Sequence, residues 1–362
     1  MTDFWHKLKK PIVGLAPMDG ITDQPFRYIQ KKYGSPDVLY TEFATVEGLC
    51  RGASQPLRDF MYAEMERPIV AQIYGTTPKY FYQTAVLVCQ LGFDGIDINM
   101  GCPAKNVAHS GAGAALIQTP ELAIEIVKAV QAGVNDWAGG KTVDDCKDLK
   151  EKFRTEVKRR QELLPKKYQA HKKIPVSIKT RIGYSQPTVD TWLPTLLELE
   201  PSVIAVHGRT LKQSYSGLAS WTEIAKVKQL AKDTPTLILG NGDVNNRKQA
   251  AELCAKHNLD GALIGRHSFG NPFVFHNNDN NEQINVFYIA LDHANNYQTT
   301  YQNTDHNSFL PMRKHLGWYT KGLPNAKEVR AQLYQTNSAK ETADVFLQHN
   351  LLTQKEVDSI LE

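Results

Sequence analysis

One cysteine in an irregular segment is the residue of this chain that is best suited to chemistry. Cys102 lies in Asn99-Met100-Gly101-Cys102-Pro103, directly after a short apolar run. Glycine and proline constrain the backbone there, which a thiol that only packs would not require. A thiol with an unperturbed pKa of about 8.5 is mostly protonated at neutral pH and can act as a general acid. An inert, buried packing role is the alternative, because it is the common fate of lone cysteines.

Lys179 and Gln72 belong to the residue types that a flavin ring requires. An ammonium stabilises the negative charge that a reduced flavin carries near N1 and O2. A side-chain amide can both donate to and accept from the ring's amide edge. The phosphate tail requires backbone N–H groups and a cation, which Asn241-Gly242 and Gly265-Arg266 can provide with His207 nearby. Taken singly, Lys179 could be a solvent-seeking lysine and His207 a core histidine, but their joint placement favours a site.

A scaffold must bring these residues together, and the chain between them alternates between strand and helix patterns. Short β-branched runs predict eight strands, and spacers such as 79–91 and 120–132 have helical periodicity. Eight such units fit an α/β fold of the TIM (β/α)8 barrel type, whose usual size is about 250 residues. A doubly wound open sheet is the alternative. The predicted strands are 11–16, 37–41, 68–73, 94–98, 175–180, 202–207, 235–239 and 260–264.

Polar or glycine-rich groups occur at the end of every predicted strand. Active sites of TIM barrels lie at the C-terminal ends of the strands. A random surface would place one or two polar groups there, so a group at every strand end predicts one convergent site. In chain order these groups are Pro17-Met18-Asp19, Glu42, Gln72, Asn99-Met100-Gly101-Cys102, Lys179 with Arg181, His207 with Arg209, Asn241-Gly242-Asp243 and Gly265-Arg266.

One connection is too long for a simple barrel. Residues 134–173 form a charged insertion, in which a helix is predicted from Cys146 to Leu164. From Lys141 to Arg181 there are 14 Lys and Arg against 6 Asp and Glu, a net charge of +8, although the whole chain carries only +4. A concentrated basic segment can attract a polyanion. A solvated helical face is the alternative interpretation.

The pattern changes after residue 275. Asn277–Asn281 is a polar linker, and beyond it the strand patterns stop. Ser338–Glu341 and Thr353–Glu356 have the spacing of capping boxes, and Asn325–Glu328 is a weaker version. We therefore predict a barrel over 1–275 and a helical domain over 276–362.

Composition excludes several classes of protein. Hydrophobic residues make up 41% and charged residues 22% of the chain, as in ordinary globular proteins. Five scattered cysteines without a CxxC pair argue against a disulfide framework and a zinc site, so we expect no metal. No apolar run approaches the ~20 residues of a membrane span. The apolar run 11–16 is followed at once by Asp19 and Asp23, unlike a signal peptide. We expect a cytoplasmic protein that does not bind membranes.

Six motifs, in order, resemble those of the tRNA-dihydrouridine synthase family. Ala16-Pro17-Met18-Asp19-Gly20-Ile21-Thr22-Asp23 resembles its opening motif, and Asn99-Met100-Gly101-Cys102-Pro103-Ala104-Lys105 resembles the signature around its catalytic cysteine. The other four are Ile178-Lys179-Thr180-Arg181, Val206-His207-Gly208-Arg209-Thr210, Asn241-Gly242-Asp243 and Ile264-Gly265-Arg266. In the tail, Met312-Arg313-Lys314-His315-Leu316-Gly317-Trp318-Tyr319 resembles the helical domain of the bacterial B-type branch.

The resemblance implies a flavin-dependent oxidoreductase. NADPH would reduce FMN, and a uridine in the D-loop of a tRNA would be flipped out to stack on the flavin. Flavin N5 would deliver hydride to uracil C6, Cys102 would protonate C5, and Asn99 would hold the uracil edge. Lys105, Arg181 and Arg209 would contact the substrate, with flavin as the alternative for the two arginines. FMN would be held by Pro17, Met18, Asp19, Gln72, Lys179, His207, Asn241, Gly242, Asp243, Gly265 and Arg266.

The chain departs from the family pattern in two places. The basic insertion is longer than usual, and the loop His109–Gly113 lacks the basic residues often found after the cysteine motif. Our hypothesis is that the insertion compensates by contacting RNA phosphates. Two other functions remain as alternatives to dihydrouridine synthesis in tRNA. One is an FMN-dependent reductase of a free pyrimidine, similar to dihydroorotate dehydrogenase, and the other is a non-catalytic RNA-binding barrel. We expect a monomer.

Overall fold

The computed structural model describes residues 3–276, 284–305 and 307–362, so the predicted linker Asn277–Asn281 lies outside the described residues. The chain forms two compact units. The first contains residues 1–22 and 37–265, and the second contains residues 23–36 and 266–362. Among the helices of the described residues, none is both long and apolar enough to cross a membrane.

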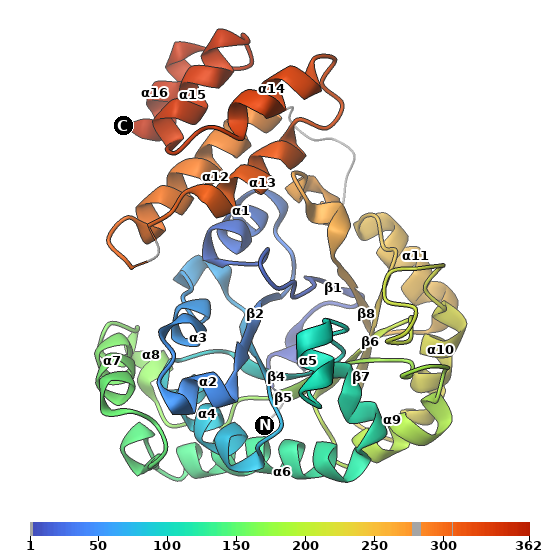
Figure 1. The fold of residues 1–362 in the computed structure, drawn as a ribbon. Helices are drawn as coiled ribbons and strands as arrows, with labels where there is room; N and C mark the ends of the chain where they lie inside the picture. The colour runs from blue at the N-terminus through green and yellow to red at the C-terminus, as the bar shows by residue number, and fades with distance from the viewer. Residues whose placement is uncertain (1–2, 277–283, 306) are drawn as a thin grey trace. The chain divides into compact units, whose positions relative to one another are not determined.

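The first unit is an eight-stranded parallel barrel, which confirms the predicted fold (Figure 1). The strand order is β1-β8-β7-β6-β5-β4-β3-β2. Two backbone hydrogen bonds close the ring between β1 and the chain leading into β2, from Leu15 N to Val38 O (3.1 Å) and from Asp37 N to Val13 O (2.9 Å). The strands are β1 (Ile12–Leu15), β2 (Leu39–Thr45), β3 (Ile69–Tyr74), β4 (Gly95–Met100), β5 (Val176–Arg181), β6 (Val203–His207), β7 (Leu237–Asn241) and β8 (Gly261–Ile264).

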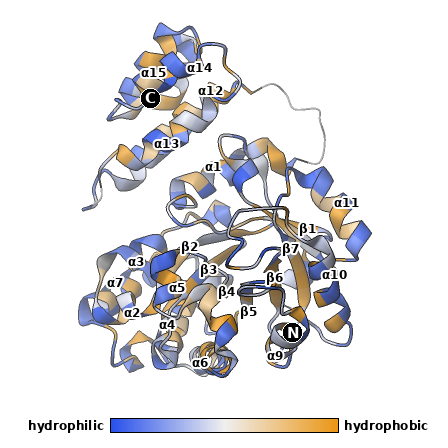
Figure 2. Ribbon diagram, turned by 45° about the vertical axis from the view of Figure 1, so that its right-hand side comes forward, coloured by the Kyte–Doolittle hydropathy of each residue, from blue (hydrophilic) through white to orange (hydrophobic). Residues whose placement is uncertain are grey.

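The longer helices of this unit surround the barrel and mix hydrophilic with hydrophobic residues, as Figure 2 shows. The helix predicted over 120–132 continues to Ala138. It does so because Val134 and Trp137 are buried and extend its apolar stripe by a further turn and a half. The helices of this unit are α2 (Val46–Arg51), α3 (Ser54–Asp59), α4 (Pro78–Gln90), α5 (Lys105–His109), α6 (Pro120–Ala138), α7 (Glu151–Glu162), α8 (Lys166–Gln169), α9 (Val189–Leu197), α10 (Trp221–Leu230) and α11 (Arg247–His257).

Apolar side chains fill the barrel interior, and an N-terminal residue joins them. Val203 and Ala205 of β6 and Leu239 of β7 belong to one buried cluster. Trp5 belongs to the same cluster and is fully buried. Its ring lies 6.2 Å from that of Tyr40 at the ring centroids. Trp5 precedes β1, so it fills the interior from the end of the barrel opposite to the C-terminal strand ends.

The insertion forms α7 and α8 against the outside of the barrel. The helix predicted from Cys146 begins at Glu151 instead, because Cys146 follows a separate short 3-10 helix, Val143–Asp145. Much of its positive charge is engaged locally. Lys158 pairs with Asp144 at 3.0 Å, and Arg159 and Arg160 both pair with Glu156.

The hypothesis that the insertion contacts RNA phosphates stays a prediction for Lys158, Arg159, Arg160, Lys166 and Lys167, and the lysines in and after α8 are exposed. These are Lys166, Lys167, Lys172 and Lys173.

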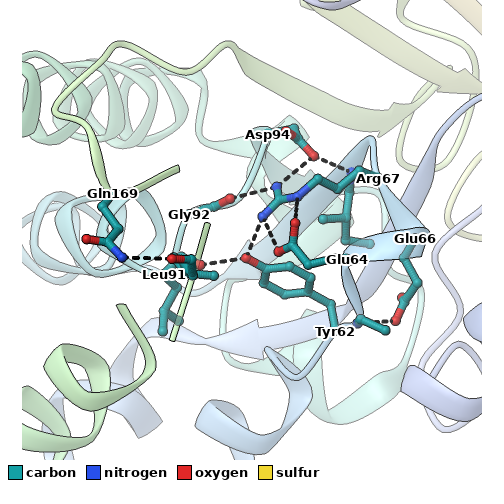
Figure 3. A network of polar contacts seen from close by, with 11 residues as sticks. Tyr62, Glu64, Glu66, Arg67, Leu91, Gly92, Asp94 and Gln169 are labelled. Carbon is teal, nitrogen blue, oxygen red and sulfur yellow. Dashed lines mark hydrogen bonds and ion pairs between the residues drawn. The ribbon is translucent and has the colours of Figure 1, made fainter. Parts of the chain in front are cut away.

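Arg67, a partly buried arginine just before β3, lies at the centre of a polar network (Figure 3) and also contacts the insertion. Arg67 donates to Gly92 O (2.8 Å), to Asp94 Oδ2 (3.1 Å) and to both carboxylate oxygens of Glu64 (2.9 and 2.8 Å). The flat face of its guanidinium lies 3.4 Å from the ring centroid of Tyr168 in α8. A guanidinium can serve carboxylates in its plane and an aromatic ring on its face, which a lysine cannot do.

The second unit is helical. Asp292 of α12 accepts from Lys32 Nζ and from the Tyr33 hydroxyl of α1, both at 2.7 Å, which explains why α1 groups with the C-terminal helices rather than with the barrel. Its helices are α1 (Gln24–Gly34), α12 (Val286–Tyr301), α13 (Leu310–Tyr319), α14 (Ala326–Leu333), α15 (Ala339–Gln348) and α16 (Gln354–Leu361).

The predicted caps of the second unit differ in outcome. Thr353 and Glu356 form the reciprocal capping box. Ser338 caps α15 through Glu341 N at 3.1 Å, but the Glu341 carboxylate binds Asn337 N instead of completing the box. Asn325 is the N-cap residue of α14, which begins at the next residue as expected, but its side chain makes no capping bond.

Replacing Trp5 tests its role inside the barrel. Trp5→Ala should lower the free energy of unfolding by about 3–5 kcal/mol, because a fully buried indole leaves a cavity. Phe4→Ala is the matched control, since Phe4 stacks on Trp5 (4.6 Å between centroids) but is only partly buried. Denaturant unfolding measures both. Equal shifts for the two variants would contradict the interior role of Trp5.

Candidate active site

Strand alternation brings most of the predicted site residues to the mouth of the barrel. On β6, Val203 and Ala205 point to the buried interior, so His207 follows them on the same side. The same step of two leads from Leu239 to Asn241 on β7. His207 and Asn241 are register partners in neighbouring strands. Gln72, Asn99 and Lys179 also lie within their strands rather than after them.

The cysteine loop begins later than predicted. β4 continues to Met100, because Asn99 and Met100 remain paired with Lys179 and Thr180 of β5. The irregular segment therefore starts at Gly101. Asn99 therefore lies on a strand, where the sheet fixes the position of its side chain.

Asn99 holds the cysteine loop. Its Oδ1 accepts from Gly101 N (3.0 Å) and from Cys102 N (2.9 Å). Its Nδ2 donates to Gln72 Oε1 at 3.0 Å. Both lone pairs of Asn99 Oδ1 and one of its two N–H groups are thus used within the protein. One N–H of Asn99 is left for a ligand.

A buried carboxylate ends this chain of hydrogen bonds. Gln72 Nε2 donates to Asp97 Oδ2 at 2.7 Å, and Ser177 Oγ donates to Asp97 Oδ1 at 2.6 Å. Asp97 accepts at one end and backbone N–H groups donate at the other, so both amide side chains have only one consistent orientation. We call Asp97, Gln72 and Asn99 the amide relay.

Burial sets the protonation of the relay. It raises the pKa of Asp97 to about 6, against the hydrogen bonds from Gln72 and Ser177 and the charge of Lys179, all of which lower it. Sequence reasoning missed Asp97 and Ser177. The available signal was the alternation Gly95, Asp97, Asn99, which puts Asp97 on the interior side of a strand.

Cys102 is the accessible thiol among the five. It is partly exposed, whereas the other four cysteines are buried. Burial raises the pKa of Cys102, Asp19 raises it further, and Arg181 and Lys179 lower it. Its carbonyl oxygen accepts from Ala114 N at 3.2 Å, so the segment after α5 supports the loop. The thiol is therefore held protonated at neutral pH, as a general acid requires.

Lys179 carries a positive charge whose hydrogen-bonding capacity is not filled by the described residues. It is partly exposed, and no side chain or backbone group of the described residues accepts a hydrogen bond from its ammonium. Burial lowers the pKa of Lys179 to about 8, and the nearby charge of Arg181 acts in the same direction. A positive charge with unfilled hydrogen-bonding capacity beside Cys102 is suited to an anionic ligand.

The two predicted arginines donate hydrogen bonds to backbone carbonyl oxygens and to a carboxylate. Arg181 Nε donates to Gly101 O (2.7 Å), and its Nη1 donates to Thr210 O (3.0 Å) and Ser214 O (3.2 Å). Arg209 Nη2 donates to both oxygens of Asp243 (2.8 and 2.7 Å). Both guanidiniums are almost fully buried. These contacts position the loops around the mouth of the barrel.

Two glycines shape the loops after β7 and β8. Gly242 has φ +122°, where a side chain would be strained and would lie 2.6 Å from Ala219 Cβ. A Cβ on Gly265 would meet only Met18 Sδ at 3.5 Å and Ala16 Cβ at 3.8 Å. Asn241 Nδ2 donates to Leu263 O at 3.0 Å and joins the two strands.

The remaining predicted residues lie on both units. Pro17 and Met18 are partly exposed, and Asp19 and Lys105 are exposed, all on the first unit. Arg266 starts a short helix of the second unit.

Comparison with known proteins identifies one family. A family model described as Dihydrouridine synthase (Dus) matches residues 14–143 and 162–356. A probable tRNA-dihydrouridine synthase of Staphylococcus aureus is 32% identical over 350 residues, which cover 94% of this chain and 93% of the relative. Probable tRNA-dihydrouridine synthase 2 of Bacillus subtilis is 31% identical over 350 residues, which cover 94% of each chain. The unmatched residues 144–161 fall within the insertion.

The charge of Asp19 should be measurable at Cys102. Asp19→Asn removes a negative charge that opposes the thiolate, so the pKa of Cys102 should fall and its alkylation by iodoacetamide should reach half its maximal rate at a lower pH. Peptide mass spectrometry across pH 6–10 gives the profile. Asp233→Asn, at an 87% exposed carboxylate elsewhere, is the matched control. Coincident profiles for the two variants would rule out the proposed coupling.

Proposed function

Because this chain belongs to the dihydrouridine synthase family and is an enzyme of the oxidoreductase type, we propose that it reduces a D-loop uridine of tRNA to dihydrouridine. The proposed cofactor is FMN, and the proposed reductant is NADPH. Support comes from the names of the relatives, which cover nearly the whole chain. The observation that carries the proposal is a partly exposed, protonated thiol, Cys102, fixed beside an unpaired ammonium at a barrel mouth.

The residues at the mouth fit a flavin. Lys179 offers a positive charge without a hydrogen-bonded partner, which suits the ring edge that gains negative charge on reduction. Gln72 retains one N–H and one lone pair after its bonds to Asp97 and Asn99. Gly265 has no side chain to cover its backbone, and a Cβ there would already be in contact with Met18, so glycine suits the approach of a ligand to backbone. We assign the phosphate end to Gly242 and Gly265, with His207, Asn241, Asp19, Asp243 and Pro17 shaping the site. Arg266 belongs to the second unit and stays a prediction from the sequence.

Saturation of the uracil C5=C6 bond needs a hydride at C6 and a proton at C5. The hydride is the chemistry that bound FMN, reduced by NADPH, would supply. Cys102 supplies the proton, and the thiolate that remains is stabilised by Arg181 and Lys179, the two cations that lower its pKa. Asn99 fixes the thiol through the backbone N–H of Cys102 and offers its remaining N–H to a uracil carbonyl.

RNA presentation completes the proposal. A uracil within a folded RNA has to leave its stack before a side chain can reach C5. Lys105 is exposed at the start of α5, three residues after Cys102, where it can meet a phosphate near that uridine. Arg181 and Arg209 act on the substrate indirectly, by holding the loops that would surround it.

Removing the thiol tests the proton donor. Cys102→Ser should slow dihydrouridine formation in an unmodified tRNA by about 10²–10⁴-fold, because a hydroxyl of much higher pKa replaces the general acid. Reduction of bound FMN by NADPH should keep its wild-type rate. Nucleoside mass spectrometry measures the first rate and loss of flavin absorbance the second. A wild-type rate of dihydrouridine formation in the variant would refute this role of Cys102.

Removing the ammonium tests the flavin assignment. With the pKa of Lys179 near 8, the positive charge is present below that pH and is lost as the pH rises through it. Wild-type FMN reduction by NADPH should therefore slow above about pH 8. This alkaline limb of the pH–rate profile should be absent from Lys179→Met. Stopped-flow absorbance from pH 6 to 10 gives both profiles. Lys128→Met, at an exposed lysine of α6, is the control and should keep the limb. If Lys179→Met keeps it too, Lys179 does not face the flavin.

A further inference from the structure

The loop after β6 exposes two large apolar side chains on the same rim as Cys102. Residues 208–220 connect β6 to α10, so the loop lies at the C-terminal ends of the strands. Tyr215 is 60% exposed and Leu218 is 84% exposed. Of the large hydrophobic residues in the described part of the chain, Leu218 has the highest exposed fraction. Exposure of this kind costs solvation free energy unless a partner covers it.

Buried arginines hold this loop from below. Arg181 donates to Thr210 O and Ser214 O, and Arg209 Nη2 donates to Gly217 O at 2.6 Å. Asp243, the ion-pair partner of Arg209, also accepts from Ala219 N at 2.9 Å. Charge-assisted bonds to carbonyl oxygens in a buried setting are strong. The loop is therefore anchored on both sides of Tyr215 and Leu218.

Backbone hydrogen bonds and two positive φ angles fix the shape of the loop around its tip, residues 214–218. Leu211 N and Lys212 N donate to Gly183 O and Tyr184 O, both at 3.0 Å. Ser214 has φ +50°, which is unfavourable for a residue other than glycine, and Gly217 has φ +67°. A strained turn that is held in place by its surroundings is typical of functional loops. The exposure of Tyr215 and Leu218 is thus built into the fold.

The loop is coupled directly to the cysteine loop. The guanidinium of Arg181 donates to Gly101 O and to Ser214 O at the same time. Gly101 precedes Cys102, and Ser214 precedes Tyr215. One rigid planar group therefore sets the spacing between the thiol and the apolar tip.

We propose that Tyr215 and Leu218 pack against an unstacked base of the RNA, next to the uridine that is flipped toward Cys102. This inference rests on the proposed function. Extruding a nucleotide removes the stacking partner of its neighbour, and aromatic or aliphatic side chains take that place in proteins that distort nucleic acids. A second protein chain is a poorer occupant, because two side chains cover far less than the roughly 800 Å² per partner of a stable interface.

The test compares serine variants at two exposed leucines. Leu218→Ser should raise KM for an unmodified tRNA about fivefold to tenfold, as loss of one covered apolar contact predicts, whereas Leu230→Ser should leave it unchanged. Leu230 is 38% exposed and is the last residue of α10, which leads back to the start of β7, so it is an exposed leucine away from the strand ends and outside the insertion. Tyr215→Ser should also raise KM, and Tyr215→Phe should restore it, because the ring and not the hydroxyl makes the contact. NADPH-driven FMN reduction should be equal in all variants.

The outcomes separate this inference from the proposed function. A wild-type protein that forms no dihydrouridine in tRNA would defeat the proposed function itself. An active wild type in which Leu218→Ser and Tyr215→Ser have the KM of Leu230→Ser would overturn the inference alone. An unchanged KM together with altered self-association in sedimentation would make the tip a protein contact and would also overturn it. A raised KM with slower FMN reduction would show damage to the barrel mouth rather than loss of a base contact, and would overturn it too.

Discussion

A buried negative charge at Asp97 organises the site. A carboxylate inside a barrel is costly unless donors surround it, and here Ser177 and Gln72 provide them at 2.6 and 2.7 Å. That requirement orients Gln72, and Gln72 in turn orients Asn99. Asn99 Oδ1 then accepts hydrogen bonds from the backbone N–H groups of Gly101 and Cys102. The position of the thiol is thus set through the side chains of Asp97, Gln72 and Asn99, all of which lie within strands that the barrel keeps rigid. A loop cysteine gains the precision of a sheet residue in this way.

The same principle operates at the rim. Arg181 and Arg209 are buried, yet their charges are directed at carbonyl oxygens and at Asp243 rather than at solvent. They join the loops after β4, β5, β6 and β7 into one frame. Lys179 is the contrasting case, because its ammonium has no hydrogen-bonded partner among the described residues and its pKa is lowered to about 8. Charges that build the site are satisfied within the protein, and the charge left unsatisfied is the one proposed to meet the cofactor.

The sequence predicts the barrel well, because apolar β-branched runs report burial and all eight occur as strands. Strand ends were less predictable. β2 continues past Thr41 to Thr45 and β4 past Ile98 to Met100, because the hydrogen-bonded ladder persists through polar residues that interrupt the apolar pattern. Partners were the least predictable feature. Gln72 and Asn99 were expected to face ligands, but they bind each other first, and Asp97 was missed. A sequence shows which side chains can make hydrogen bonds, whereas only the sheet register decides which ones meet.

We propose that the barrel mouth around Cys102 reduces a uridine within tRNA. The most direct test of this proposal is to map dihydrouridine, nucleotide by nucleotide, in an unmodified tRNA transcript incubated with the protein, FMN and NADPH. We expect dihydrouridine at a discrete D-loop position, dependent on both the protein and NADPH, and no reduction of free uracil. Absence of dihydrouridine from the tRNA, or efficient reduction of free uracil in its place, would contradict it.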